Sequence, residues 1–139
     1  MEITANALQS VNANSNVVFT NTAVPGNGSM VHREGSGLVT LRGITNQCRA
    51  RFRVTFGANI ALPSTGTAGP ISVAIAINGE PVAETTMIST PTAVSQFNSI
   101  SRSLFLNVPA GCCQQISVEN TSGVAIDVEN ASLIIERVA

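Results

Sequence analysis

Residues 49–56 read RARFRVTF, and apolar and polar side chains alternate through the whole stretch. In an extended strand the even-numbered residues, all apolar, would lie on one face, and three arginines and a threonine would lie on the other. A strand with one buried and one solvated face is typical of antiparallel sheets. The stretch therefore predicts a β-protein whose apolar row faces a core.

A second alternating stretch, residues 71–77, ends at a strong turn signal. Asn78-Gly79 follows it, and this dipeptide fits the two central positions of a tight hairpin turn. We expect the hairpin to return along residues 82–88 and to be broken off by Thr90-Pro91. This hairpin is the most clearly specified local structure in the sequence.

Gly and Pro punctuate the rest of the chain at short intervals, which is the spacing of a sandwich or barrel. Further strands are expected at residues 16–20, 30–33, 38–42, 100–108, 115–120, 124–128 and 132–138. Residues 93–99 leave a helical turn and an irregular strand equally open. The count is about nine or ten strands with no crossover helix, so the sheets should be antiparallel. We expect one all-β domain over residues 1–139, with residues 1–15 available as an extended N-terminal arm.

The charge content excludes broad classes of partner. Only 11% of the residues are charged, no lysine is present, and the formal net charge is -1, so the electrostatic footprint of a nucleic-acid-binding protein is missing. The N-terminal residues do not resemble a secretory signal. No run approaches the roughly 20 apolar residues that cross a bilayer. We therefore expect neither a nucleic acid nor a membrane as partner.

The few reactive side chains do not suggest an enzyme. A catalytic triad would have to use His32, the sole histidine, with Asp127, the sole aspartate, and nothing in their spacing supports one. Cys48, Cys112 and Cys113 form no Cys-x-x-Cys motif, and adjacent cysteines rarely bind one tetrahedral ion together. We expect simple thiols, no metal, no cofactor and no catalytic activity.

The arginines of the first stretch form a charged stripe. Arg49, Arg51 and Arg53 would lie on one face of one strand, roughly 6 to 7 Å apart. Such a stripe could hold a phosphate, a carboxylated sugar or an acidic partner. Alternatively it could pair with Glu80, Glu84 or another acid of this chain or of a sister chain.

Two apolar residues break the alternation of their strands. Phe105 and Ile134 lie opposite the main apolar rows of residues 104–108 and 133–135. A lone subunit would leave them exposed or cover them with a loop. Because obligate interfaces are commonly this apolar, we expect both residues in a contact between subunits.

The C-terminal third carries a resemblance to a known family. Residues 104–111 (LFLNVPAG), 116–120 (ISVEN) and 131–137 (ASLIIER), together with the IAING turn at 75–79, resemble the C1q/TNF-like jelly-roll family in its bacterial and phage versions. The resemblance implies an antiparallel jelly-roll sandwich. It also implies tight homotrimers that form the tip of a fibre or a knob on a particle.

The chain departs from that family in two ways. It has no collagen-like tract or coiled coil upstream of the resemblance, and its strands contain few aromatic residues. We therefore expect a homotrimeric structural protein of a phage-like particle, such as a capsid decoration, head-fibre or tail auxiliary protein. It would assemble in the host cytoplasm, reside in the virion and contact a capsid or tail protein. The alternative is an adhesion or spore-coat module of a bacterial or spore surface. Such a module would bind a glycan or protein through loops such as residues 63–70.

Overall fold

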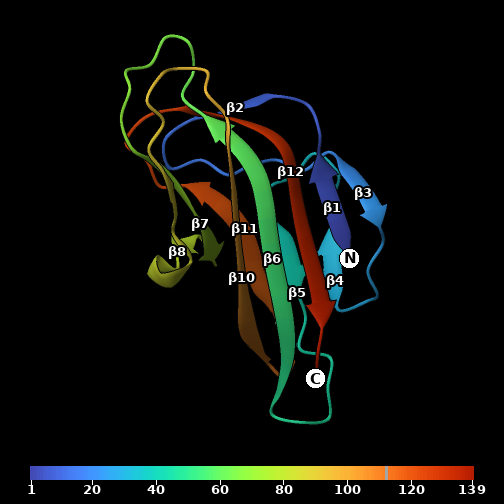
Figure 1. The fold of residues 1–139 in the computed structure, drawn as a ribbon. Helices are drawn as coiled ribbons and strands as arrows, with labels where there is room; N and C mark the ends of the chain where they lie inside the picture. Colours follow the sequence, from blue (N-terminus) through green and yellow to red (C-terminus); the bar gives the residue numbers. More distant parts are fainter. Residues whose placement is uncertain (112) are drawn as a thin grey trace.

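The computed structural model describes residues 1–111 and 113–139, and in them the chain forms two antiparallel sheets that pack as a sandwich (Figure 1). Twelve strands and one short 3-10 helix lie in these described residues. The predicted antiparallel β-sandwich is confirmed, with more strands than the sequence indicated. No helix in the described part of the chain is long and apolar enough to cross a membrane.

Sheet A contains the longest strands. In spatial order it consists of β10 (Asn98–Pro109), β6 (Arg49–Ala61), β12 (Ile126–Arg137), β1 (Glu2–Ala5) and β3 (Asn21–Val24), while β2 (Gln9–Val11) also pairs with β12. β6 has 13 residues, and β10 and β12 have 12 each. Because these three strands are neighbours, they give sheet A a broad outer face (Figure 1).

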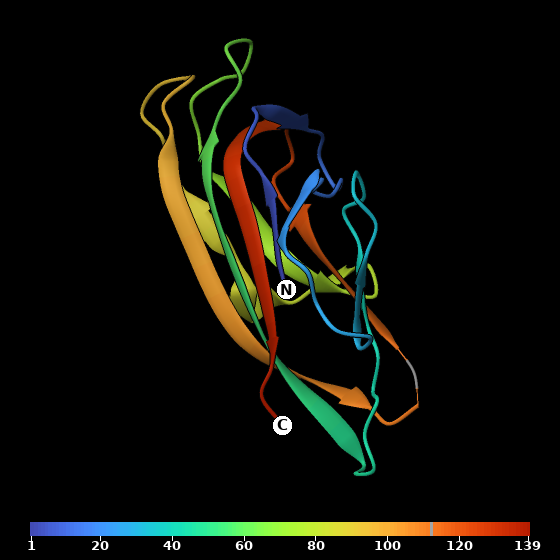
Figure 2. The ribbon, with the colours of Figure 1, turned by 90° about the vertical axis from the view of Figure 1, so that its right-hand side faces the viewer.

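Sheet B is built from shorter strands. In spatial order it consists of β4 (Met30–His32), β5 (Val39–Leu41), β11 (Gln114–Asn120), β7 (Ile71–Ile77) and β8 (Glu80–Pro81), while β9 (Met87–Ser89) also pairs with β7. In Figure 2 the loops after β6 and before β10 rise together at the top, and the β5–β6 connection lies at the opposite end. We call these the upper end and the lower end of the sandwich.

The core lies between the sheets and uses the residues that the alternation predicted. Ala50, Phe52, Val54 and Phe56 of β6 are all 0% exposed. They belong to one cluster of buried residues that includes side chains of both sheets. Phe56 also packs edge-on against Phe19, with ring centroids 6.4 Å apart. The stretch at residues 49–56 therefore does supply one wall of the core.

Residues 1–15 are part of the sandwich and not an extended arm. β1 pairs with β12 on one side and with β3 on the other, and Ile3 is fully buried. β2 pairs with the start of β12 in the same sheet. These strands have four and three residues, which is too short for an alternation to stand out in the sequence.

The hairpin at Asn78-Gly79 is confirmed, but its return strand is shorter than predicted. The two turn residues have φ angles of 53° and 85°, as a tight hairpin turn requires. β8 pairs with β7 over two residues only, and a 3-10 helix, η1 (Ala83–Thr85), interrupts the predicted strand before β9 begins. The Thr85 hydroxyl accepts a hydrogen bond from the Ile75 amide at 3.0 Å, so a side chain replaces a backbone partner there.

The predicted strand at residues 16–20 is instead a crossing between the sheets. Its side chains alternate in burial as expected, but its backbone forms only isolated bridges. The Val17 amide donates to Val118 of sheet B at 2.8 Å, and the Thr20 amide donates to Thr4 of sheet A at 3.1 Å. The alternating sequence correctly predicted which of these side chains are buried, but it did not predict which strands their backbone pairs with.

The two strands predicted at residues 124–128 and 132–138 are one strand. β12 is continuous and contains a bulge before Ser132. Asn130 has a φ of 55° there, a left-handed conformation that Asn tolerates better than most residues. The bulge shifts the alternation, which explains why the sequence indicated a break.

Candidate functional site

The outward side chains of the long strands of sheet A bring the predicted site residues together, and we call this surface face A. The strand register aligns Phe105, Arg53 and Glu136 in one row and Ser103, Thr55, Ile134 and Glu2 in the next. Four strands, β10, β6, β12 and β1, contribute to these two rows. Segments far apart in the sequence therefore form one continuous surface.

The arginine stripe is exposed on face A, and part of it has partners within the chain. Arg53 forms an ion pair with Glu136, whose Oε1 lies 2.7 Å from the arginine Nε. Arg51 donates a hydrogen bond from its Nε to Asn107 Oδ1 at 3.3 Å. The side chains of the ion pair are 47% and 45% exposed, so water screens it and its contribution to stability is about 0–1 kcal/mol.

The acid that meets the stripe is Glu136, another acid of this chain, and not Glu80 or Glu84. Glu80 lies on β8 and Glu84 on η1, and β8 pairs with β7 of sheet B. Neither acid therefore pairs with the stripe on sheet A. Arg49 forms no ion pair with any acid in the described residues. A role for the stripe in binding an anion or a partner stays a prediction.

Phe105 and Ile134 are the conspicuous apolar side chains of face A. Phe105 is 64% exposed and Ile134 is 39% exposed, and no loop covers either of them. β6 separates them, and between them the hydroxyls of Thr55 and Ser103 lie 3.0 Å apart. Face A is therefore a polar sheet surface that carries two separate apolar side chains.

A second exposed surface, which we call edge E, lies where β10 faces β9 of the other sheet. No strand pairs with the free side of β10 in the described residues. A hollow of about 290 Å³ between the two strands is lined by residues 86–88 and 99–102. Ile88, one of these lining residues, is 68% exposed, and Phe97, just before β10, is 41% exposed.

Edge E was not predicted, because Ile88 lies in the three-residue strand β9 and Phe97 lies in an irregular segment. Ile88 closes a predicted strand that the structure interrupts with η1. Phe97 falls in residues 93–99, for which no single conformation was predicted. Alternation assigns faces only along regular strands of several residues, so it gave no clear signal at either position.

His32 has contacts that fit a structural position. Its Nε2 lies 3.0 Å from the carbonyl oxygen of Ser36, and its ring packs edge-on against Phe19. Its Nδ1 is buried without a hydrogen-bond partner in the described residues. Among all the residues that the structure describes, no group of three His, Cys, Asp or Glu side chains could hold a metal ion.

The cysteines differ from one another. Cys48 is an exposed free thiol near the lower end. Cys113 forms a disulfide, so the expectation of simple thiols is wrong for it. The prediction for the adjacent pair Cys112-Cys113 also involves Cys112, and Cys112 lies outside the residues that the structure describes.

The loop of residues 63–70 lies at the upper end, as expected for a connection between sheets (Figure 2). A hollow of about 360 Å³ beside it is lined by Leu62, Pro63, Thr65, Gly66, Thr67, Val124 and Ala125. None of these residues is aromatic or charged. The hollow therefore lacks the ring faces and charged groups that usually fix a polar ligand.

Comparison with known proteins supports the fold. The sequence matches no protein-family model and no curated protein. The structure is similar to the globular domain of zebrafish complement 1qA protein, with a TM-score of 0.64 and 13% identity over 96% of this chain and 93% of that one. It is also similar to Eiger TNF from S. frugiperda, with a TM-score of 0.67 and 14% identity over 100% of this chain and 92% of that one. The chain has the C1q/TNF-like jelly-roll fold.

Proposed function

We propose that the chain is a structural jelly-roll module of a phage-like particle and that it acts as a homotrimer. The observation that carries the proposal is face A, where Phe105 and Ile134 are exposed on the longest strands of the molecule. Burying such side chains against a second subunit removes apolar area from water. The C1q/TNF-like fold supports three-fold association, and the resemblance of the C-terminal third to the bacterial and phage versions of that family is the reason to propose a place on a particle as decoration, head-fibre or tail auxiliary protein.

Edge E supplies the complementary surface that a trimer needs. In a closed three-fold ring, each contact joins one surface of a subunit to a different surface of the next. We place face A of one subunit against edge E of its neighbour, where Ile88 and Phe97 are exposed. A long unpaired edge strand such as β10 tends to aggregate unless something covers it. The same contact would therefore protect β10.

The oligomeric state tests this arrangement. Size-exclusion chromatography with light scattering should give a mass about three times that of the 14.3 kDa chain at every concentration used. The double variant Phe105→Ser, Ile134→Thr and the single variant Ile88→Thr should each shift the protein to monomer, because they change opposite sides of one contact.

Val31→Thr is the matched control for that experiment. Val31 is 43% exposed, close to the 39% of Ile134, but it lies on β4 at the far edge of sheet B. We expect this variant to stay trimeric. A monomeric unmodified chain, or a trimer that both face A and edge E variants leave intact, would contradict the proposed contact.

The assignment to a particle needs its own experiment. Particles released from the source cells should be separated on a density gradient, and the chain should peak in the fractions of the major capsid protein. Recovery only in the soluble fractions would contradict the assignment while leaving the trimer untouched. Saturable binding on a glycan array would instead favour a surface adhesion module.

A further inference from the structure

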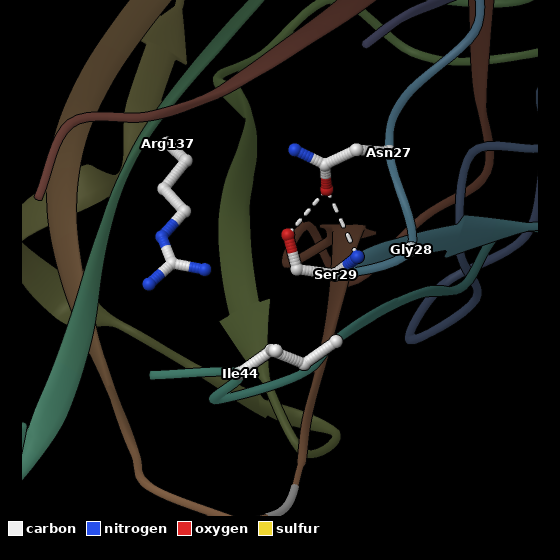
Figure 3. A pocket seen from close by; sticks show the side chains of 5 residues that line it. All are labelled: Asn27, Gly28, Ser29, Ile44 and Arg137. Atoms are coloured by element: carbon white, nitrogen blue, oxygen red, sulfur yellow. Dashed lines mark hydrogen bonds between the residues drawn. The ribbon is translucent and has the colours of Figure 1, made fainter. Parts of the chain in front are cut away.

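A hollow of about 210 Å³ opens between the two sheets at the lower end. Figure 3 shows its lining: Asn27, Gly28 and Ser29 from the loop before β4, Ile44 from the segment after β5, and Arg137 from the end of β12. Three segments that are far apart in the sequence therefore meet around it. It is separate from both face A and edge E.

Arg137 occupies a position that alternation assigns to the core. Leu133 and Ile135 on the inner side of β12 are fully buried, and Arg137 is the next residue in this row, opposite buried Phe52 of β6. Its side chain is partly buried, and it forms no ion pair with an Asp or Glu side chain in the described residues. A partly buried guanidinium is stabilised by charge-assisted hydrogen bonds to an anion.

The guanidinium of Arg137 is held so that its outer donors remain available. Its Nε donates a hydrogen bond to a main-chain oxygen of Ala139 at 3.3 Å. The two Nη groups carry four further N–H donors, and they have no hydrogen-bond partner in the described residues. Figure 3 shows this end of the side chain directed toward the space beside Ser29 and Ile44.

Asn27 is oriented by contacts on the other side of the hollow. Its Oδ1 accepts hydrogen bonds from the Ser29 amide, at 2.9 Å, and from the Ser29 hydroxyl. Ser29 is only 3% exposed, so this arrangement is anchored in the body of the protein. With its oxygen engaged twice, Asn27 turns its amide nitrogen toward the Arg137 side (Figure 3).

We propose that this hollow binds a carboxylate group. The side-chain groups left without partners are the Nη donors of Arg137 and the Nδ2 donors of Asn27, and no acidic side chain lines the site. A planar guanidinium binds a carboxylate through two parallel hydrogen bonds, and the Asn27 amide can donate to the same group. Ile44, which is 54% exposed at the rim, offers an apolar contact for the carbon chain of the ligand.

Nuclear magnetic resonance of the full-length ¹⁵N-labelled chain tests the proposal. Sodium succinate and a blocked glutamate dipeptide are titrated separately against sodium chloride of equal ionic strength. The side-chain NH₂ signal of Asn27 and the amide signal of Ser29 should shift to saturation with a carboxylate and not with chloride. Saturation with succinate indicates a free small carboxylate, and saturation with the dipeptide alone indicates an acidic side chain of a partner protein.

Two variants and a control identify the binding groups. Arg137→Gln should weaken binding about tenfold or more, because it removes the charge that assists both hydrogen bonds. Asn27→Asp keeps the acceptor for Ser29 but places a carboxylate beside Arg137, so it should abolish saturable binding even if Arg137→Gln fails to fold. Arg42→Gln, a nearby exposed arginine outside the lining, should bind like the unmodified chain. Chloride-like responses to both ligands, or binding that survives Asn27→Asp, would overturn the proposal.

Discussion

The two faces of β6 differ in how strongly the surrounding structure constrains which amino acid stands at each position. On the inner face every side chain from Ala50 to Phe56 is 0% exposed, and its size is set by the neighbours that surround it. On the outer face Arg49 and Arg51 are exposed and make few contacts, so the fold leaves their identity open. One strand therefore separates residues that hold the sandwich together from residues that are free to serve association.

The largest effect is expected from a cavity on the inner face. Phe56→Ala should lower the free energy of unfolding by about 3–5 kcal/mol, because it removes a fully buried ring that also packs against Phe19. Arg51→Ala on the outer face should change it by no more than about 0.5 kcal/mol. Urea unfolding followed by circular dichroism measures both, and similar losses in the two variants would refute the division between the faces.

A smaller loss of stability is expected from a change at Asn120, whose side-chain amide is buried on the inner side of β11. Asn120 is 0% exposed, and its Nδ2 donates to the carbonyls of Val11 and Val124 at 3.0 and 2.9 Å. Asn120→Leu leaves both carbonyls without this partner, so unfolding should become easier by about 1–3 kcal/mol. The same urea experiment applies, with Asn46→Ala in an exposed loop as the control. An unchanged midpoint would mean that water replaces the amide.

The smallest effect belongs to the ion pair on the outer face. A double-mutant cycle with Arg53→Ala and Glu136→Ala should give a coupling of no more than about 1 kcal/mol, because both side chains are about half exposed. In about 1 M salt, where charges are screened within about 3 Å, the coupling should vanish. A large coupling that resists salt would show that face A shields its charges, and would weaken the contrast between the faces.

Much of the fold was predictable because burial imposes a period on the sequence. The RARFRVTF stretch predicted its strand because every second residue is apolar. The Asn78-Gly79 dipeptide predicted its hairpin because these two residues fit the central positions of a tight turn. β1 was not predicted because a strand of four residues is too short to show a clear alternation of apolar and polar side chains. η1 was missed because a single hydroxyl, that of Thr85, replaces a strand partner, which no pattern of hydrophobicity records.

The candidate sites were less predictable because they combine distant segments. Phe105 and Ile134 could be found from the sequence, since each breaks the alternation of its own strand. Arg137 offered the same signal, a charge in the inward row that begins with Leu133, but its partners come from the loops before β4 and after β5. Only the packing of the two sheets brings Asn27 and Arg137 to one hollow.

The loop that supplies Asn27 also carries a source of chemical ageing. Gly28 follows Asn27, and a Cβ built at Gly28 would meet no atom within 4 Å apart from its own chain neighbours, so no distant segment packs against this glycine. A glycine amide nitrogen attacks the preceding asparagine side chain with little hindrance, ammonia leaves, and water opens the resulting ring to aspartate or isoaspartate. Deamidation of Asn27 by this route would place a negative charge beside Arg137 without any change in the gene. Freshly prepared and aged protein should be treated as two different samples in every binding measurement at the lower end.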